Sequence, residues 1–121
     1  MQVDQFVVSV NSEQPEAMIA FYRDKVGLTV NADFGPGAFM AGSCDFIALI
    51  IEGHDAVRGS TKEPERTALN FFVADAVAEQ KRLEGQGVKF VRSAAEEPGF
   101  GIVATFADPD GNYCQLMQLG G

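Results

Sequence analysis

The sequence predicts an α+β fold in which one arrangement, a strand, a helix and three further strands, occurs twice. Strand-like and helix-like apolar patterns follow each other in the same order in both halves of the 121-residue chain. The two expected helices also end in similar stretches, Gly27-Leu28-Thr-Val30 and Gly87-Val88-Lys-Phe90. We therefore expect a single domain with module one at 1–53, a connecting loop at 54–66 and module two at 67–121.

Module one begins with alternating β-branched residues at 5–10, which predict a strand. Asn11 or Ser12 is expected to cap the following helix, because a short polar side chain accepts a hydrogen bond from a free N–H at a helix start. Pro15 suits the first turn, where its missing N–H costs nothing, and Gly27 is expected to end the helix. Three strands are expected after it, at 28–33, 38–41 and 46–52.

Module two repeats this order after the polar loop. A strand is expected at 67–73, and Asp75 is expected to cap a helix that runs to about Glu84. Gln80 interrupts the apolar face of this helix, which makes it the weaker helix of the two. Three strands complete the module, at 88–92, 100–107 and 112–119, with a turn at 96–99 after the first of them.

The segment Asp108-Pro-Asp110-Gly111-Asn112 predicts the turn between the last two strands. Gly111 accepts the positive φ that short hairpin connections need. Two carboxylates so close together resemble a catalytic pair, but Asp and Asn are also the usual hydrogen-bond acceptors of tight turns. We predict that Asp108 and Asp110 stabilise the hairpin and take no part in catalysis.

The chain carries a formal net charge of −8, with an isoelectric point of about 4.4. This charge argues against nucleic acid and anionic membranes as partners, because no basic stripe exists to neutralise phosphates. It is compatible with a cationic small ligand, although solubility alone also explains an acidic surface. No signal peptide or membrane-spanning stretch is visible, so a cytoplasmic protein is expected. Cys44 and Cys114 would stay reduced there, and both are expected to be buried in strands.

Strand alternation separates two faces of the expected sheets. One face is wholly apolar and is expected to lie beneath the helices; it contains Phe6, Val8, Val10, Ile47, Leu49, Ile51, Leu69, Phe71, Val73, Cys114 and Leu116. The other face mixes amides, a hydroxyl, rings and small residues: Gln5, Val7, Ser9, Phe46, Ala48, Ile50, Ala68, Asn70, Phe72, Tyr113, Gln115 and Met117. Such a mixture is typical of a small-molecule cleft. The alternative is an interface between modules or subunits with a few satisfied amides.

Three stretches carry a resemblance to a known family: Ala20-Phe21-Tyr22-Arg23-Asp24-Lys-Val26-Gly27-Leu28, then Asn70-Phe71-Phe-Val73-Ala-Asp75 with Gly87-Val88, then Phe106-Ala-Asp108-Pro109-Asp110-Gly111-Asn112. In this order they resemble the vicinal oxygen chelate superfamily, which includes glyoxalase I, fosfomycin-resistance proteins, extradiol dioxygenases and bleomycin-resistance proteins. The resemblance implies two tandem βαβββ modules forming a mixed-sheet cleft with the helices packed outside. It does not choose among activities, since the fold hosts several.

In the metalloenzymes of this family the ligands lie on the first and last strand of each module, at positions that correspond here to Gln5, Ala48, Ala68 and Gln115. An amide oxygen is a weak ligand for a divalent metal, and alanine offers none. A site of two histidines and one carboxylate needs two histidines, whereas the only one here, His54, falls in the connecting loop. We therefore expect no metal, no other cofactor and no catalytic residue.

The resemblance then favours a metal-free protein of the bleomycin-resistance type, which sequesters a small ligand such as an antibiotic without transforming it. Members of that type are dimers with ligand grooves at the subunit interface, so a homodimer is expected. A cationic or aromatic ligand would stack on rings and be oriented by amides. The expected rings are Phe39, Phe46, Phe72, Phe100 and Tyr113, and the expected amides are Gln5, Asn70 and Gln115.

Two alternatives stay open from the sequence. The first is a glyoxalase-like lyase or isomerase with a displaced metal site, in which a carboxylate such as Glu52 acts as the base. The second is a subunit or partner-binding module whose cleft is vestigial. The sequence names neither the ligand nor a reaction, so it does not decide whether the chain is an enzyme.

Overall fold

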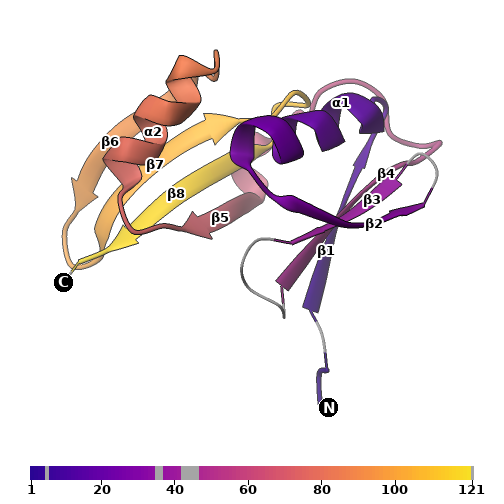
Figure 1. Cartoon of the computed structure of the whole chain (residues 1–121), viewed down its shortest axis with the longest axis horizontal. Helices are drawn as coiled ribbons and strands as arrows, with labels where there is room; N and C mark the ends of the chain where they lie inside the picture. Colours follow the sequence, from indigo (N-terminus) through magenta and orange to yellow (C-terminus); the bar gives the residue numbers. More distant parts are fainter. Residues whose placement is uncertain (5, 35–36, 42–46, 121) are drawn as a thin grey trace. The chain divides into compact units, whose positions relative to one another are not determined.

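The chain folds into two compact units, Met1–Gly59 and Ser60–Gly121, each with a four-stranded sheet and a helix. The computed structural model describes residues 1–4, 6–34, 37–41 and 47–120, with side chains for 1–4, 6–31 and 49–120 (Figure 1). This mixture of helix and sheet confirms the α+β class. No helix in those described ranges is long and apolar enough to cross a membrane.

The first unit contains a strand, a helical segment and three further strands. Its elements are β1 (Phe6–Ser12), α1 (Pro15–Ala20), η1 (Phe21–Val26), β2 (Thr29–Phe34), β3 (Gly37–Ala41) and β4 (Ile47–Gly53). The strands form a mixed sheet in the order β1-β4-β3-β2, in which β1 and β4 are parallel and the other pairs are antiparallel. The helix α1 packs against β1, β3 and β4.

The start of α1 corrects one sequence expectation. The N-cap residue is Gln14, not Asn11 or Ser12, because Pro15 occupies the first helical position and holds the residue before it out of the helix. Ser12 still contributes, since its Oγ accepts a hydrogen bond from the Gln14 N–H at 2.9 Å. The π-helical segment η1 continues α1 and ends at Gly27 with φ 96°, which confirms the expected end of the helix.

The second unit repeats the order. Its elements are the short 3₁₀ helix η2 (Pro64–Arg66), β5 (Ala68–Phe72), α2 (Ala76–Gly85), β6 (Phe90–Glu97), β7 (Gly101–Ala107) and β8 (Tyr113–Leu119). The strand order is β5-β8-β7-β6, with β5 and β8 parallel and the remaining pairs antiparallel. Figure 1 shows α2 lying over one face of this sheet, and it contacts β6, β7 and β8.

The expected cap of α2 is confirmed, because Oδ1 of Asp75 accepts a hydrogen bond from the Ala78 N–H at 3.0 Å. Leu83 on the helix is buried, as are Phe106, Cys114 and Leu116 on the strands. Full burial of a large apolar side chain stabilises the fold by about 1.5–3 kcal/mol. These buried residues therefore form the core that holds α2 on its sheet.

Gln80 is buried in this core and connects α2 to β6. Its Oε1 accepts a hydrogen bond from the Ala94 N–H at 2.7 Å, and its Nε2 donates to Ser93 Oγ at 3.3 Å. The β6–β7 ladder shifts register between Arg92 and Ala95. Such a bulge leaves a backbone group without a ladder partner. Gln80, which interrupts the apolar face of α2, supplies the hydrogen-bond partner that this backbone group lacks.

Replacing Gln80 by alanine is expected to lower the free energy of unfolding by about 1–3 kcal/mol, because the Ala94 N–H would lose its acceptor in a partly buried position. Urea denaturation followed by circular dichroism measures the change. Gln86→Ala is the matched control, since Gln86 is exposed at the end of the same helix. Equal midpoints for the two variants would show that the Gln80 amide does not stabilise the bulge.

The same bulges explain a second correction, which concerns the length of β6. A strand ending at Arg92 and a turn beginning at Glu96 were expected, but β6 runs to Glu97 and the turn follows it. Glu96 still pairs with Ile102, and Glu97 pairs with Gly101. Each bulge inserts a residue and restores the pairing beyond it, so two bulges extend the strand past the point where its alternation breaks.

Candidate functional site

The sheet of the second unit has one face toward α2 and one face away from it. Gln118 on β8 points toward α2, because its Oε1 accepts a hydrogen bond from the Ala76 N–H at 2.9 Å. Alternation then turns the odd-numbered residues of β8 away from the helix. We call this side the distal face. On β8 and its two neighbours, β5 and β7, it includes residues that the strand register joins: Ala68, Asn70, Phe72, Val103, Thr105, Ala107, Tyr113, Gln115 and Met117.

A row of polar side chains crosses the distal face on all four strands. Asn70 pairs with Gln115, Gln115 pairs with Thr105, and Thr105 pairs with Arg92. The Nε2 of Gln115 donates a hydrogen bond to Thr105 Oγ1 at 3.3 Å. We call these four residues the polar row. Asn70 and Arg92 at its ends are exposed, whereas Thr105 at its centre is only 5% exposed.

An apolar patch adjoins the polar row at one end of the distal face. Phe72 on β5 is 62% exposed, and its ring lies 6.5 Å from the ring of Phe100, which is 38% exposed. Met117 pairs with Phe72 and Leu119 pairs with Gly101, so both lie beside these rings on the same face. We call Phe72, Phe100, Met117 and Leu119 the apolar patch. Exposed rings grouped in this way are typical of surfaces that bind something.

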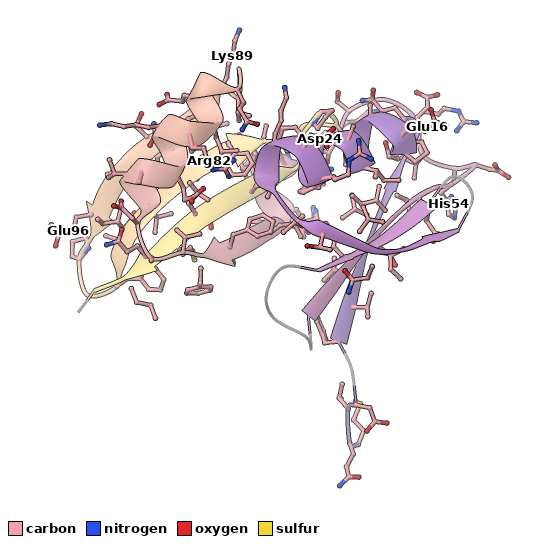
Figure 2. All side chains as sticks on the ribbon, viewed as in Figure 1. Glu16, Asp24, His54, Arg82, Lys89 and Glu96 are labelled. Carbon is pink, nitrogen blue, oxygen red and sulfur yellow. The ribbon has the colours of Figure 1, made fainter. Side chains whose placement is uncertain are left out.

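The charges of the distal face are concentrated at its β6 edge. The guanidinium of Arg92 forms an ion pair with Glu97, and both side chains are partly exposed. Figure 2 labels Glu96, the neighbour of Glu97, at this outer edge of the sheet. The distal face therefore combines exposed aromatic rings, neutral amides and one paired guanidinium.

The hairpin between β7 and β8 is held by Asp108. Its Oδ1 accepts hydrogen bonds from the N–H groups of Asp110 and Asn112, both at 2.9 Å, and its Oδ2 accepts one from Asn112 Nδ2 at 2.9 Å. Gly111 has φ 84°, as the turn requires. The carboxylate of Asp108 is therefore occupied by turn hydrogen bonds, which supports the structural role expected for it.

The profile of the Glyoxalase/Bleomycin resistance protein/Dioxygenase superfamily matches residues 2–116. The chain belongs to this superfamily. The resemblance inferred from the three sequence stretches is thereby confirmed. A comparison with curated proteins finds no match.

Several solved structures share the fold. TnmS3, an antibiotic binding protein from Streptomyces sp. CB03234, is 23% identical, with 98% of each chain covered and a TM-score of 0.82. A glyoxalase/bleomycin resistance protein from the same Streptomyces is 26% identical, with 95% of this chain and 100% of that chain covered and a TM-score of 0.69. A glyoxalase/bleomycin resistance protein/dioxygenase from Nocardioides is 18% identical, with coverage of 100% and 87% and a TM-score of 0.79.

The residues at the superfamily's metal positions do not fit a divalent metal. In the second unit these positions are Ala68 and Gln115, which lie on the same face and on paired strands. Alanine has no donor atom, and the amide of Gln115 already donates to Thr105. The matching positions of the first unit are Gln5, outside the described residues, and Ala48, whose side chain is not described. Among described residues, no three His, Cys, Asp or Glu side chains form a group that could hold a metal.

The structure brings five of the eight predicted ligand-binding residues together: Asn70, Phe72, Phe100, Tyr113 and Gln115. Gln5 and Phe46 fall outside the described residues, and Phe39 lies in β3 with its side chain undescribed. Whether any of the eight contacts a ligand stays a prediction.

Sequence reasoning missed Arg92 and Thr105. Thr105 could have been found by counting back from the turn, because the pairing of Ala107 with Tyr113 fixes that of Thr105 with Gln115. Arg92 could not be placed from alternation, since register shifts lie on both sides of it.

Other polar candidates lie on other elements of the chain. His54 is exposed in the loop after β4, where its Nδ1 accepts a hydrogen bond from the Ala56 N–H at 3.1 Å (Figure 2). Cys114 is a fully buried thiol on the side of α2, as expected, whereas Cys44 lies outside the described residues. Glu52 is half-buried in β4 and pairs with Asn11 of β1.

A small polar pocket of about 240 Å³ lies beside the hairpin, between the segment at 61–67 and Asn112. Arg66 in its wall is held by Glu63 through hydrogen bonds of 2.9–3.0 Å. The pocket contains no aromatic ring and lies apart from the apolar patch. The distal face therefore remains the better candidate for binding an organic ligand.

Proposed function

We propose that this protein is a metal-free, small-molecule-binding member of its superfamily that sequesters a cationic or aromatic ligand, such as an antibiotic. Membership of the superfamily and its likeness to an antibiotic binding protein support this class of function. The amides of Asn70 and Gln115 would orient the ligand by hydrogen bonds. Tyr113, Gln5, Phe39 and Phe46 are proposed as further ligand contacts.

One observation carries the proposal: two aromatic rings are exposed on a sheet face that also presents amides. A face that is only solvated would not leave Phe72 62% exposed beside Phe100. Ring contacts contribute about 0.5–1.5 kcal/mol each beyond the area they bury. A flat, conjugated ligand is therefore the kind of molecule that this surface would bind most strongly.

The metal-free part of the proposal rests on donor chemistry. Two of the four superfamily metal positions are alanines and the other two are glutamines. Glu52 supports the rival proposal of a lyase or isomerase with a displaced metal, because it is a half-buried carboxylate. Metal analysis of protein purified without chelator separates the two, since stoichiometric zinc, nickel, manganese or iron would favour the enzyme.

A thermal-shift screen against cationic antibiotics and aromatic metabolites tests the binding function directly. A ligand present at a hundred times its dissociation constant is expected to add about 2.7 kcal/mol to the free energy of unfolding. Absence of any stabilising ligand would favour a partner-binding module instead. Light scattering tests the proposed homodimer. The buried thiol of Cys114 suits the proposed reducing cytoplasm.

Replacing Phe72 by alanine is expected to weaken binding of a screened ligand by about threefold to tenfold, through the loss of one ring contact. Calorimetric titration measures the change. Because Phe72 is exposed, its replacement should leave the fold intact. Val77→Ala is the control, because Val77 is also an exposed apolar residue but lies on α2. An equal loss of affinity in both variants would contradict a role for the apolar patch.

A further inference from the structure

We propose that the distal face selects a planar aromatic acid, with its carboxylate or phenolate oxygen held by Arg92 and its rings on the apolar patch. This inference rests on the proposed binding function and narrows its ligand class. It favours the aromatic ligand over the cationic one.

The first argument is the charge of the distal face. Arg92 supplies a positive charge at the β6 edge of this face. The carboxylate of Glu97, on the same edge, is already paired with it. A cationic ligand would be repelled by the guanidinium, and the charge of the Glu97 carboxylate is already neutralised by that guanidinium. An anionic oxygen could bind the planar guanidinium, which has five N–H donors, because Glu97 occupies only some of them.

The position of Arg92 supports its access to the ligand. Phe90 packs its ring against Phe106 at 5.3 Å, and Ser93 accepts a hydrogen bond from Gln80 of α2, so both face the helix. Arg92 lies between them and pairs with Thr105 of the distal face. The bulges on either side of Arg92 therefore place a cation at the end of the polar row.

The polar row also offers hydrogen-bond donors. The hydroxyl of Thr105 accepts from Gln115 at the buried centre of the row, so the donors that a ligand can reach lie on its exposed members. The Nε2 of Gln115 carries a second hydrogen, and the exposed amide of Asn70 adds two more. Donors outnumber acceptors along the row, so the surface fits a ligand edge that carries acceptor oxygens.

The size of the ligand follows from strand spacing. Neighbouring strands lie about 4.8 Å apart, so the row from β6 to β5 spans about 14 Å. A molecule of two or three fused rings covers more of this distance than a single ring does, so it brings its rings closer to the apolar patch while its acid group meets Arg92.

The net charge of the chain does not outweigh these local contacts. The formal charge of −8 is spread over the whole sequence, and at physiological ionic strength exposed charges are screened beyond about 8 Å. The Arg92–Glu97 pair is 41% and 43% exposed, and exposed pairs of this kind are weak. The guanidinium can therefore exchange part of its pairing for a ligand oxygen.

Three probes that share a naphthalene ring and differ in charge test the inference: the anion naphthalene-2-carboxylate, the neutral 2-naphthamide and the cation 2-naphthylmethylammonium. Calorimetric titration of the full chain is expected to rank the carboxylate first and the ammonium last. Arg92→Gln should weaken the carboxylate about tenfold and leave the amide unchanged, since a hydrogen bond to a charged group is lost. Glu97→Gln should strengthen the carboxylate, because it frees the guanidinium.

Arg82→Gln is the matched control, since Arg82 is also paired with a glutamate but lies on α2. It should change no affinity. A preference for the ammonium probe, or an unchanged ranking in Arg92→Gln, would overturn the inference and leave the proposed binding function standing. Failure of all three probes, together with an empty thermal-shift screen, would overturn the binding function as well.

Discussion

Replacing Asp108 by alanine is expected to lower the free energy of unfolding by about 3 kcal/mol, one of the largest losses that a single side chain in this protein can cause. The substitution removes the acceptor of three hydrogen bonds, from the N–H groups of Asp110 and Asn112 and from the amide of Asn112. Asp108 is 5% exposed, so water cannot replace the lost partners freely. Urea denaturation measures the change.

Asp75→Ala is the control for this experiment, because it also removes a carboxylate that accepts a backbone N–H. Asp75 makes its cap bond at an exposed helix end, where such a loss costs about 1 kcal/mol. If Asp108→Ala were no more destabilising than Asp75→Ala, the Asp108 carboxylate would not be the group that stabilises the turn. A catalytic role for Asp108 would then need to be reconsidered.

The sequence predicted the features that depend on local chemistry. The helix end at Gly27, the cap at Asp75 and the turn at Asp108 each follow from one residue type in one backbone position. The common face of Asn70 and Gln115 was also predictable, because strand alternation places both on the side opposite the buried Cys114. Local rules thus located most of the distal face.

Features that depend on tertiary contacts could not be predicted. Gln80 was read as an interruption of the apolar face of α2, whereas it serves a backbone group of a strand that follows later in the chain. The bulges of β6 break the alternation that would have placed Arg92 on the distal face. A bulge has no residue signature here, since no glycine lies in β6, and so its effect on the site appears only in the structure.

The length of the first helix shows the same limit. Its end was placed correctly, yet its final six residues, Phe21–Val26, form a π-helical segment. The N–H groups of Gly27 and Leu28 both donate to the carbonyl oxygen of Tyr22 at 2.9 Å. Periodicity over so short a stretch cannot distinguish an α-helix from a π-helix, because one additional residue in a turn changes the apolar spacing very little.

Gly101→Ala is expected to destabilise the protein by about 3 kcal/mol or more. Gly101 has φ 151°, and a Cβ there would lie 1.9 Å from the carbonyl oxygen of Gln118 on β8. The clash is with backbone, so no side-chain rotation relieves it. Phe100 precedes Gly101 and accepts a hydrogen bond from the Gly120 N–H at 2.9 Å, so a shift of β7 that relieves the clash would also move the ring that packs beside Phe72.

Two measurements follow for this variant: a lower midpoint in urea denaturation and a weaker affinity for any ligand that binds the apolar patch. Gly85→Ala is the control, because Gly85 lies within α2 and a Cβ there meets no atom within 4 Å. That control is expected to gain about 0.5–1 kcal/mol, as alanine is favoured over glycine in a helix. A Gly101→Ala protein as stable as the parent would mean that β7 and β8 separate at this corner without cost. The apolar patch would then not depend on the close approach of the two strands.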